Sequence, residues 1–107
     1  MKRRGKYNNV RTTVAGKRFD SKMELRRWQD LELLLEVGAI SELQHHVRYP
    51  LEINGVKLGY YECDAQYRMG NDIIVEDTKG MRTAVYRLKA KLMKAIHGIE
   101  IQEIKTK

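Results

Sequence analysis

The chain has little of the residues that build disulfide-linked or membrane-spanning proteins. Its 107 residues contain one cysteine, one proline, one tryptophan and one phenylalanine. The single cysteine, Cys63, excludes an internal disulfide, which fits a reducing cytoplasm. No apolar run approaches the roughly 20 residues of a membrane span, and the basic N-terminus is not followed by the apolar segment of a secretory signal. We therefore expect a soluble cytoplasmic protein with no membrane partner.

Charge is what the chain has in quantity, at 33% of residues beside an ordinary hydrophobic content of 42%. A chain of this length has room for one core with two or three layers of secondary structure. The dense positive charge at the start is typical of a flexible arm that binds a polyanion. We expect a basic flexible arm over residues 1–11 and a single folded domain over residues 12–107.

The net charge of +7 is unevenly distributed. Residues 1–27 carry ten Lys and Arg against two acids, residues 28–77 carry three against ten, and residues 78–94 carry six and no acid. A nuclease needs carboxylates for a metal among cations for phosphate, whereas a protein that only coats nucleic acid does not need an acidic centre. The pattern predicts DNA as the partner, and a solvated basic surface is the alternative. The predicted phosphate contacts, which give affinity without base specificity, are Lys2, Arg3, Arg4, Lys6, Lys17, Arg18, Lys22, Arg82, Arg87 and Lys89.

Capping and turn signals divide the chain into helices and strands. Ser21 with Glu24 three residues later is a capping box, so a helix begins there and ends near Gly38. A second helix, with Val85, Leu88, Leu92 and Ile96 on one side, runs from about Thr83 to Gly98. A short hairpin is expected over 12–19, strands over 43–53, 60–67, 73–79 and 99–104, and turns at Asn54-Gly55 and Gly70-Asn71. These elements predict an α/β (α+β) fold in the order helix, three strands, helix, strand, with a mixed central sheet flanked by helices.

The strand over residues 73–79 carries the strongest chemical signal. Its aliphatic start, Ile73 to Val75, is typical of a central strand covered on both faces. Side chains alternate across a strand, so Asp77 and Lys79 project from one face and Glu76 and Thr78 from the other. A carboxylate that holds a divalent cation, beside a lysine that neutralises developing charge, suits a metal-dependent phosphodiesterase. The alternative is a surface ion pair at the end of a strand.

Two further acids are candidates for the same site. Asp64 lies in the neighbouring predicted strand, and with Asp77 it would form an oxygen-only site suited to Mg²⁺ or Mn²⁺; a solvated edge carboxylate is the alternative. Glu24 caps a helix, and it also lies where it could reach a metal or orient water, so both roles stay open. The adjacent His45 and His46 should face opposite sides of a strand and form an exposed pair, which argues against a histidine-metal nuclease.

Four stretches of the chain resemble the PD-(D/E)xK nuclease superfamily, which has the restriction-endonuclease-like fold, over roughly residues 7–104. Within that superfamily, they look like small phage-encoded proteins related to Holliday-junction resolvases. The stretches are Gly16-Lys17-Arg18-Phe19-Asp20-Ser21-Lys22-Met23-Glu24, Tyr61-Glu62-Cys63-Asp64, Val75-Glu76-Asp77-Thr78-Lys79-Gly80 and Val85-Tyr86-Arg87-Leu88-Lys89. Cys63 stands where the name-giving proline would precede the aspartate.

The resemblance implies roles for four residues. Asp64 and Asp77 would be metal ligands, Lys79 the catalytic lysine, and Glu24 the helix-borne acid that some branches use as a further ligand. The neighbouring Glu76 leaves the second ligand ambiguous, since a bulge in the strand would exchange it with Asp77.

The resemblance also implies an activity, namely a Mg²⁺- or Mn²⁺-dependent DNA endonuclease. This hydrolase would act on branched DNA as a Holliday-junction resolvase in phage DNA recombination, in the bacterial host cytoplasm. Symmetric cleavage of a junction requires two active sites, hence a homodimer. Three alternatives stay open: a non-catalytic DNA-binding module with a nuclease fold, a nuclease acting on linear or damaged DNA, and a structural or regulatory phage protein whose arm binds a protein partner.

Overall fold

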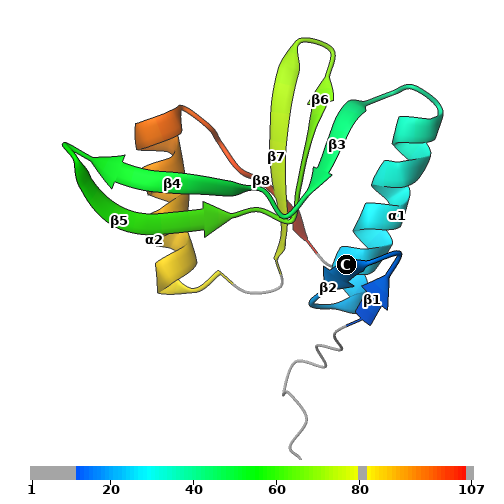
Figure 1. The fold of residues 1–107 in the computed structure, drawn as a ribbon, viewed down its shortest axis with the longest axis horizontal. Helices are drawn as coiled ribbons and strands as arrows, with labels where there is room; N and C mark the ends of the chain where they lie inside the picture. Colours follow the sequence, from blue (N-terminus) through cyan, green and yellow to red (C-terminus); the bar gives the residue numbers. More distant parts are fainter. Residues whose placement is uncertain (1–11, 80–81, 106–107) are drawn as a thin grey trace, which may run out of the picture.

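A four-stranded mixed sheet forms the centre of the molecule (Figure 1). The computed structural model describes residues 12–79 and 82–105. The sheet has the strand order β3-β6-β7-β8, in which β3, β6 and β7 are antiparallel and β8 is parallel to β7. Its strands are β3 Ser41–His45, β6 Ala65–Met69, β7 Asp72–Lys79 and β8 Gln102–Lys105. The parallel pair requires a crossover connection, and the second helix provides it.

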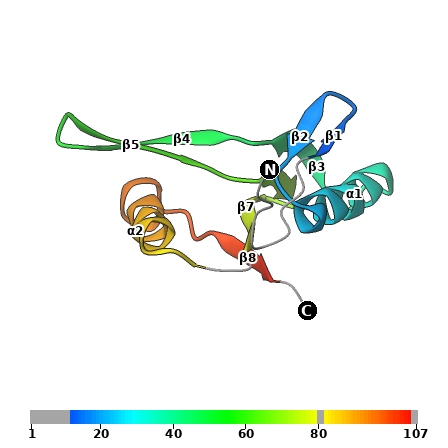
Figure 2. The same ribbon diagram turned by 90° about the horizontal axis from the view of Figure 1, so that it is seen from below.

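Two helices cover the sheet, one on each side (Figures 1 and 2). Helix α1, Lys22–Glu36, begins as predicted, with the Ser21 hydroxyl accepting the Glu24 N–H at 3.1 Å. Helix α2, Ala84–Leu92, begins at Thr83 as predicted and continues into a π-helical turn, η1 Met93–His97. No helix among the described residues is long and apolar enough to cross a membrane. When the two hairpins are set aside, the elements follow the order helix, three strands, helix, strand. This order confirms the predicted α+β class with a mixed sheet.

The sheet separates two hydrophobic cores. The α1 core consists of Phe19, Trp28, Leu31, Ile40, Ala65 and Tyr67. The α2 core consists of Leu51, Tyr61, Cys63, Val75, Tyr86 and Met93. Strand β7 contributes to both, because Ile74 packs against the α1 core while its neighbour Val75 lies in the α2 core. The prediction of a central strand covered on both faces is therefore confirmed for these two residues.

The inward face of the second helix differs from the predicted one. Val85 and Leu88 were expected on its apolar side, yet they are 64% and 58% exposed. The residues that pack are Tyr86 and Met93, both buried in the α2 core. The prediction was wrong for Val85 and Leu88, because the large, mostly apolar Tyr86 ring covers more core surface than Val85. It is confirmed for Leu92 and Ile96, which pack against the α2 core.

Two predicted strands are each divided in two. The segment 43–53 forms β3 and β4 Arg48–Ile53, and the segment 60–67 forms β5 Val56–Glu62 and β6. The pairs His45↔Ala65 and Arg48↔Glu62 keep one register, so the four strands make a single antiparallel ribbon. It bends at residues 46–47 and 63–64, where His46 has a φ of 55°. Two backbone hydrogen bonds cross the bend, His46 N–H to Asp64 C=O at 3.1 Å and Cys63 N–H to Val47 C=O at 3.0 Å.

Beyond the bend, β4 and β5 leave the central sheet and extend beside α2 as a hairpin (Figures 1 and 2). Its tip is the predicted turn at Asn54-Gly55, where both residues have positive φ, 52° and 77°. A shorter hairpin, β1 Thr12–Val14 and β2 Lys17–Phe19, lies near the start of α1 as predicted. The basic arm expected over residues 1–11 lies outside the described residues.

The bend changes which side chains share a face. Tyr61 and Cys63 pack in the α2 core, whereas Ala65 and Tyr67 pack in the α1 core. A straight strand would have kept all four on one face, because side chains alternate across a strand. Asp64 consequently stands at the bend between β5 and β6 and not in the middle of a strand.

Candidate functional site

Three of the predicted site residues meet where the bend of the ribbon approaches the end of β7. The Asp64 N–H donates to Asp77 Oδ1 at 3.2 Å, and the Thr78 N–H donates to Asp64 Oδ2 at 2.8 Å. Lys79 Nζ lies 3.5 Å from Asp77 Oδ2, on the same side of β7. The local cause is the antiparallel pairing of β6 with β7, which brings Asp64 beside Asp77.

The two aspartates form an electrostatically unbalanced pair. Asp77 is 2% exposed. Burial raises the pKa of the Asp64 carboxyl well above its usual range, and the charges of Asp77 and Glu24 raise it further. Carboxylates that repel one another away from water offer a divalent cation a favourable oxygen-ligated position.

Aromatic side chains on the α2 side support this pair. The Tyr61 hydroxyl donates to Asp77 Oδ2 at 2.6 Å, and burial followed by the Asp77 charge raises the pKa of Tyr61, so it stays a donor. Lys79 Nζ lies 4.3 Å from the centroid of the Tyr86 ring, a cation–π contact. Burial raises the pKa of the Cys63 thiol to about 12, so this neighbour of Asp64 is not a nucleophile at neutral pH.

Glu76, the alternative second acid, projects to the opposite side and is fully paired. Arg27 Nε and Nη2 donate to its two carboxylate oxygens at 2.8 and 3.0 Å, and the Tyr67 hydroxyl donates to Oε2 at 2.8 Å. Strand β7 pairs with β6 and β8 without a register shift, so no bulge exchanges the two acids. The Arg27 partner was missed from the sequence; its place one turn after Glu24, on the inward side of α1, was the available signal.

The Glu24 side chain contacts both the start of α1 and the bend of the ribbon. The residue is 6% exposed. Oε1 accepts the N–H of Asp20 at 2.9 Å, one residue earlier than a regular capping box predicts, while Oε2 lies 2.7 Å from His46 Nε2. One carboxylate oxygen therefore stabilises the start of α1, and the other faces the bend of the ribbon.

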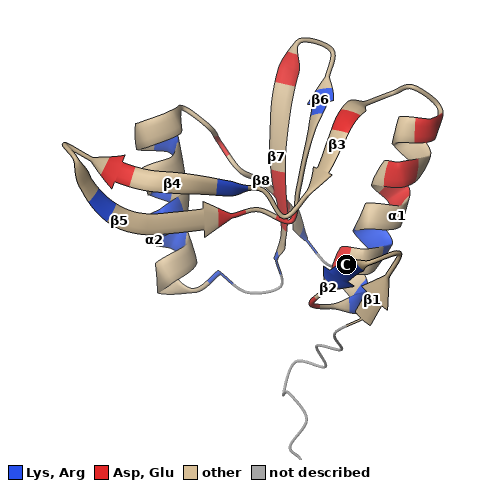
Figure 3. Ribbon diagram, in the orientation of Figure 1, with Lys and Arg blue, Asp and Glu red and all other residues tan. Residues whose placement is uncertain are grey.

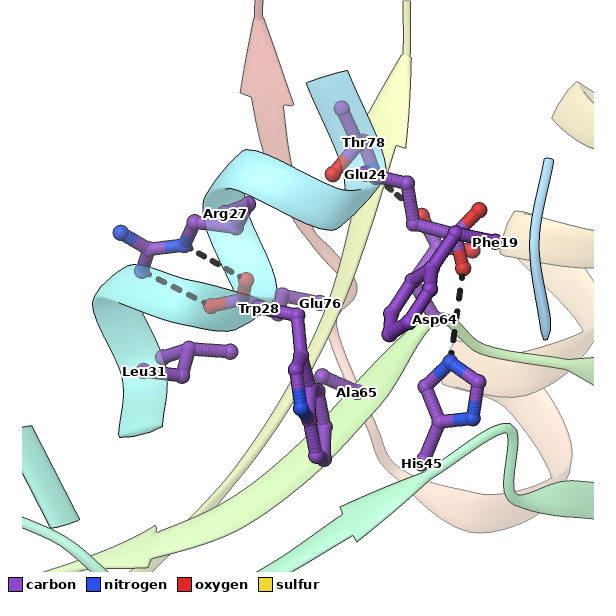
Figure 4. A pocket seen from close by; sticks show the side chains of 10 residues that line it. All are labelled: Phe19, Glu24, Arg27, Trp28, Leu31, His45, Asp64, Ala65, Glu76 and Thr78. Carbon is purple, nitrogen blue, oxygen red and sulfur yellow. Dashed lines mark hydrogen bonds and ion pairs between the residues drawn. The ribbon is translucent and has the colours of Figure 1, made fainter. Parts of the chain in front are cut away.

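A small cavity lies between α1 and the bend (Figure 4). Its polar lining includes Glu24, His45, Asp64 and Thr78, so the helix acid and the bend acid share one space. In Figure 4 the His45 ring points towards the carboxylates at the top of the cavity. The remaining lining residues are Phe19, Arg27, Trp28, Leu31, Ala65 and Glu76.

The sequence predicted that the two histidines face opposite sides of a strand, and this prediction was wrong. Their rings are stacked, with centroids 3.7 Å apart and planes 20° apart. The reason is the bend, since the left-handed φ of His46 interrupts strand alternation directly after His45. The His45 side chain is 10% exposed. Burial, followed by the proximity of His46, lowers the pKa of His45 to about 4, so this ring is neutral at physiological pH.

The predicted phosphate contacts fall into two described groups (Figure 3). Lys17, Arg18 and Lys22 lie at β2 and the start of α1, with Lys17 Nζ 5.8 Å from the Trp28 ring centroid. On α2, Lys89 lies 5.4 Å from the Tyr60 ring centroid. A groove of about 600 Å³ beside α2 and β8 is lined by Arg82, Arg87, Ala90, Lys91, Lys94, Glu100, Ile101, Gln102 and Glu103. Lys2, Arg3, Arg4 and Lys6 lie outside the described residues.

Comparison with known proteins gives a family but no activity. No protein with a curated description matches the chain. The crystal structure of protein VC1899 from Vibrio cholerae is similar to it, with a TM-score of 0.49 and 13% sequence identity over 90% of this chain. The chain spans 29% of the length of that protein. The profile of the family described as "Protein of unknown function (DUF1064)" matches residues 4–106, and the chain belongs to that family.

Proposed function

We propose that the chain is a DNA endonuclease that hydrolyses phosphodiester bonds with Mg²⁺ or Mn²⁺, of the PD-(D/E)xK type. The observation that carries this proposal is the contact between Asp64 and Asp77, with Lys79 Nζ 3.5 Å from Asp77. The acids are 13 residues apart in sequence, and the fold brings them together with one partly exposed lysine beside Asp77. Buried, mutually repelling carboxylates are uncommon outside functional sites.

The donor set fits a hard divalent cation. Carboxylate oxygens are the ligands that Mg²⁺ and Mn²⁺ prefer, and Asp64 and Asp77 would hold the ion. When bound, the ion supplies an activated water and polarises the phosphoryl group. Lys79, held between Asp77 and the Tyr86 ring, would neutralise charge on the attacked phosphate. Glu24 lines the same cavity as Asp64 and would serve as a further ligand or orient water.

The proposed substrate is branched DNA. The cations of β2, the start of α1 and α2 would contact phosphates, and they offer affinity without base reading. Selectivity for a four-way junction rests on the sequence resemblance to phage resolvases, and it requires a homodimer with two active sites. A nuclease for linear or damaged DNA and a non-catalytic DNA-binding module are the rival functions.

One experiment separates these possibilities. Labelled four-way junction, flap, linear duplex and single-stranded DNA are incubated with the full chain in Mg²⁺, Mn²⁺ or EDTA. The wild type is compared with three variants, Asp77→Asn, Lys79→Ala and the control Asp72→Asn. The control changes an exposed acid of the same strand. We expect cleavage of the junction to fall by about 100- to 1000-fold in the first two variants and to be unchanged in the control.

Each possible result supports a different conclusion. Equal cleavage in EDTA, or full activity of Asp77→Asn, would overturn the proposed mechanism. Equal cleavage of every substrate would overturn only the junction assignment. Salt-sensitive DNA binding without cleavage by the wild type would favour the non-catalytic module, and no binding to DNA would favour a protein partner.

A further inference from the structure

We propose that Glu24, His45 and His46 form a second cation site, for a borderline divalent ion such as Zn²⁺ or Co²⁺, which adjoins the Asp64–Asp77 pair through Glu24. The ligand atoms of the three residues all lie within 4.8 Å of one another. Glu24 comes from the first turn of α1, His45 is the last residue of β3, and His46 follows it at the bend of the ribbon. The site stands on this geometry alone, whether or not the chain cleaves DNA.

His45 provides the strongest independent sign of a missing ligand. Among the described residues, its Nε2 is the buried side-chain polar atom that has no hydrogen-bond partner. The ring is held against Phe19 and Trp28, with centroids 4.7 and 4.9 Å away. This atom lies 3.7 Å from Glu24 Oε2, too far for a hydrogen bond. Leaving a buried polar atom unpaired is unfavourable, and a cation between the two groups would satisfy it.

His46 is oriented for metal binding by its other nitrogen. Its Nδ1 lies 3.6 Å from Glu62 Oε2, while Nε2 lies 2.7 Å from Glu24 Oε2. The Glu24 oxygen only accepts, so Nε2 carries the proton of this hydrogen bond in the metal-free chain; a cation at Nε2 would require the proton to move to Nδ1, on the side of Glu62. Arg48 fixes the other oxygen of Glu62 at 2.8 Å. In many metal sites a carboxylate lies beside one imidazole nitrogen while the other nitrogen binds the metal, and Glu62, His46 and the proposed ion would have this order.

The site requires a small rearrangement that the structure permits. Ligand atoms of a tetrahedral ion with bonds of 2.0–2.1 Å lie about 3.3–3.5 Å apart. The stacked rings must therefore splay so that both Nε2 atoms point to one ion. His46, whose side chain is 25% exposed, has room to turn, whereas His45 is held between aromatic rings.

The ligand types select the class of cation. Two imidazole nitrogens and one carboxylate oxygen suit Zn²⁺, Co²⁺ and similar ions, whereas Mg²⁺ prefers an all-oxygen octahedron. The Asp64–Asp77 pair has that oxygen-only character. Three protein ligands would leave the fourth position of a tetrahedral ion open, next to the cavity that Asp64 also lines.

Cobalt titration of the metal-free full chain tests the site. Bound Co²⁺ is followed by its visible absorption and by quenching of Trp28, the single tryptophan, whose ring lies 4.9 Å from His45. We expect one Co²⁺ per chain, displaced by Zn²⁺ and not by excess Mg²⁺. His45→Gln and His46→Gln should weaken binding at least tenfold. Asp64→Asn should bind Co²⁺ with a Kd within about threefold of the wild-type value. The same holds for the control His97→Gln, which removes a histidine that is hydrogen-bonded to the Pro50 carbonyl.

Each result decides the proposal. Absence of saturable binding, or unchanged binding in a folded His46→Gln, overturns it; circular dichroism in the near ultraviolet checks the fold. Loss of binding in Asp64→Asn with full binding in His46→Gln would place the cation at the aspartates and also overturns it. Failed Co²⁺ binding beside intact Mg²⁺-dependent cleavage removes only this site, and Co²⁺ binding without cleavage removes only the nuclease proposal.

Discussion

Glu76 and Asp77 are neighbours on β7 with nearly equal burial, 1% and 2% exposed, but opposite surroundings. Glu76 meets a guanidinium and a phenol, so its charge is balanced on the α1 side. Asp77 accepts hydrogen bonds from the Tyr61 hydroxyl and the Asp64 N–H, but the Asp64 carboxyl lies close enough to repel its charge, and its cation, Lys79, is 3.5 Å away and partly exposed. A buried acid that serves only stability should be balanced like Glu76. The unbalanced negative charge at Asp77 is therefore the feature that indicates a missing ligand.

Removal of the Arg27 guanidinium should produce the largest effect on stability. Arg27→Ala leaves Glu76 buried beside one phenol, and an uncompensated buried charge costs about 3 kcal/mol. The free energy of unfolding, measured by urea denaturation, should fall by that amount. Arg26→Ala, an exposed neighbour on the same helix, should change it by less than about 0.5 kcal/mol. Equal losses in both variants would remove the contrast between the two acids.

Asp64 should make the metal-free protein less stable as the pH rises. Its pKa in the folded state is raised by burial, then by Asp77 and Glu24, above its value in the unfolded chain. From about pH 4 upward the unfolded chain releases a proton that the folded chain keeps, so the free energy of unfolding falls. We expect a contribution of about 1 kcal/mol per pH unit, below the full-proton limit of about 1.4.

The measurement is urea unfolding in EDTA between pH 5 and 8. Asp64→Asn cannot lose this proton, so its slope should be shallower than that of the wild type. Asp72→Asn, at an exposed position of β7, should keep the wild-type slope. Parallel slopes in the wild type and Asp64→Asn would contradict the assignment of the raised pKa.

Local signals made the elements of the fold predictable. The hydroxyls of Ser21 and Thr83 cap the two helices, and Asn54-Gly55 forms the expected two-residue turn. The bend was not predictable in the same way. It depends on a left-handed φ at His46, a non-glycine residue whose sequence neighbours resemble a continuous strand.

The candidate site was predictable where it depends on strand periodicity. Alternation placed Asp77 and Lys79 together, and antiparallel pairing brought Asp64 beside them. Arg27 with Glu76 was missed because the contact joins residues 49 apart; the place of Arg27 one turn after Glu24 indicates its side of the helix but not its partner. The histidine pair was missed because alternation was applied across the bend, where it no longer holds.

Cation binding should stabilise the side of β7 that carries Asp77. A Mg²⁺ concentration of ten times Kd should raise the free energy of unfolding by about 1.4 kcal/mol, because the ion binds only the folded chain. Asp77→Asn should abolish this gain, while His97→Gln, far from the aspartates in sequence and bonded to Pro50, should retain it. Thermal unfolding with and without Mg²⁺ measures this gain in each variant. A gain that persists in Asp77→Asn would place the ion elsewhere.

The two phenols give the finest test, because each donates to one of the two acids. Tyr67→Phe removes a hydrogen bond from Glu76, which keeps Arg27, so we expect a loss of about 1 kcal/mol and unchanged Mg²⁺ affinity. Tyr61→Phe removes the hydrogen bond from Asp77 and leaves its repulsion with Asp64 less compensated. A cation then relieves more repulsion, so calorimetry should show Mg²⁺ binding roughly threefold tighter beside a similar loss of stability. If both substitutions changed the Mg²⁺ affinity equally, the two faces of β7 would not be functionally distinct.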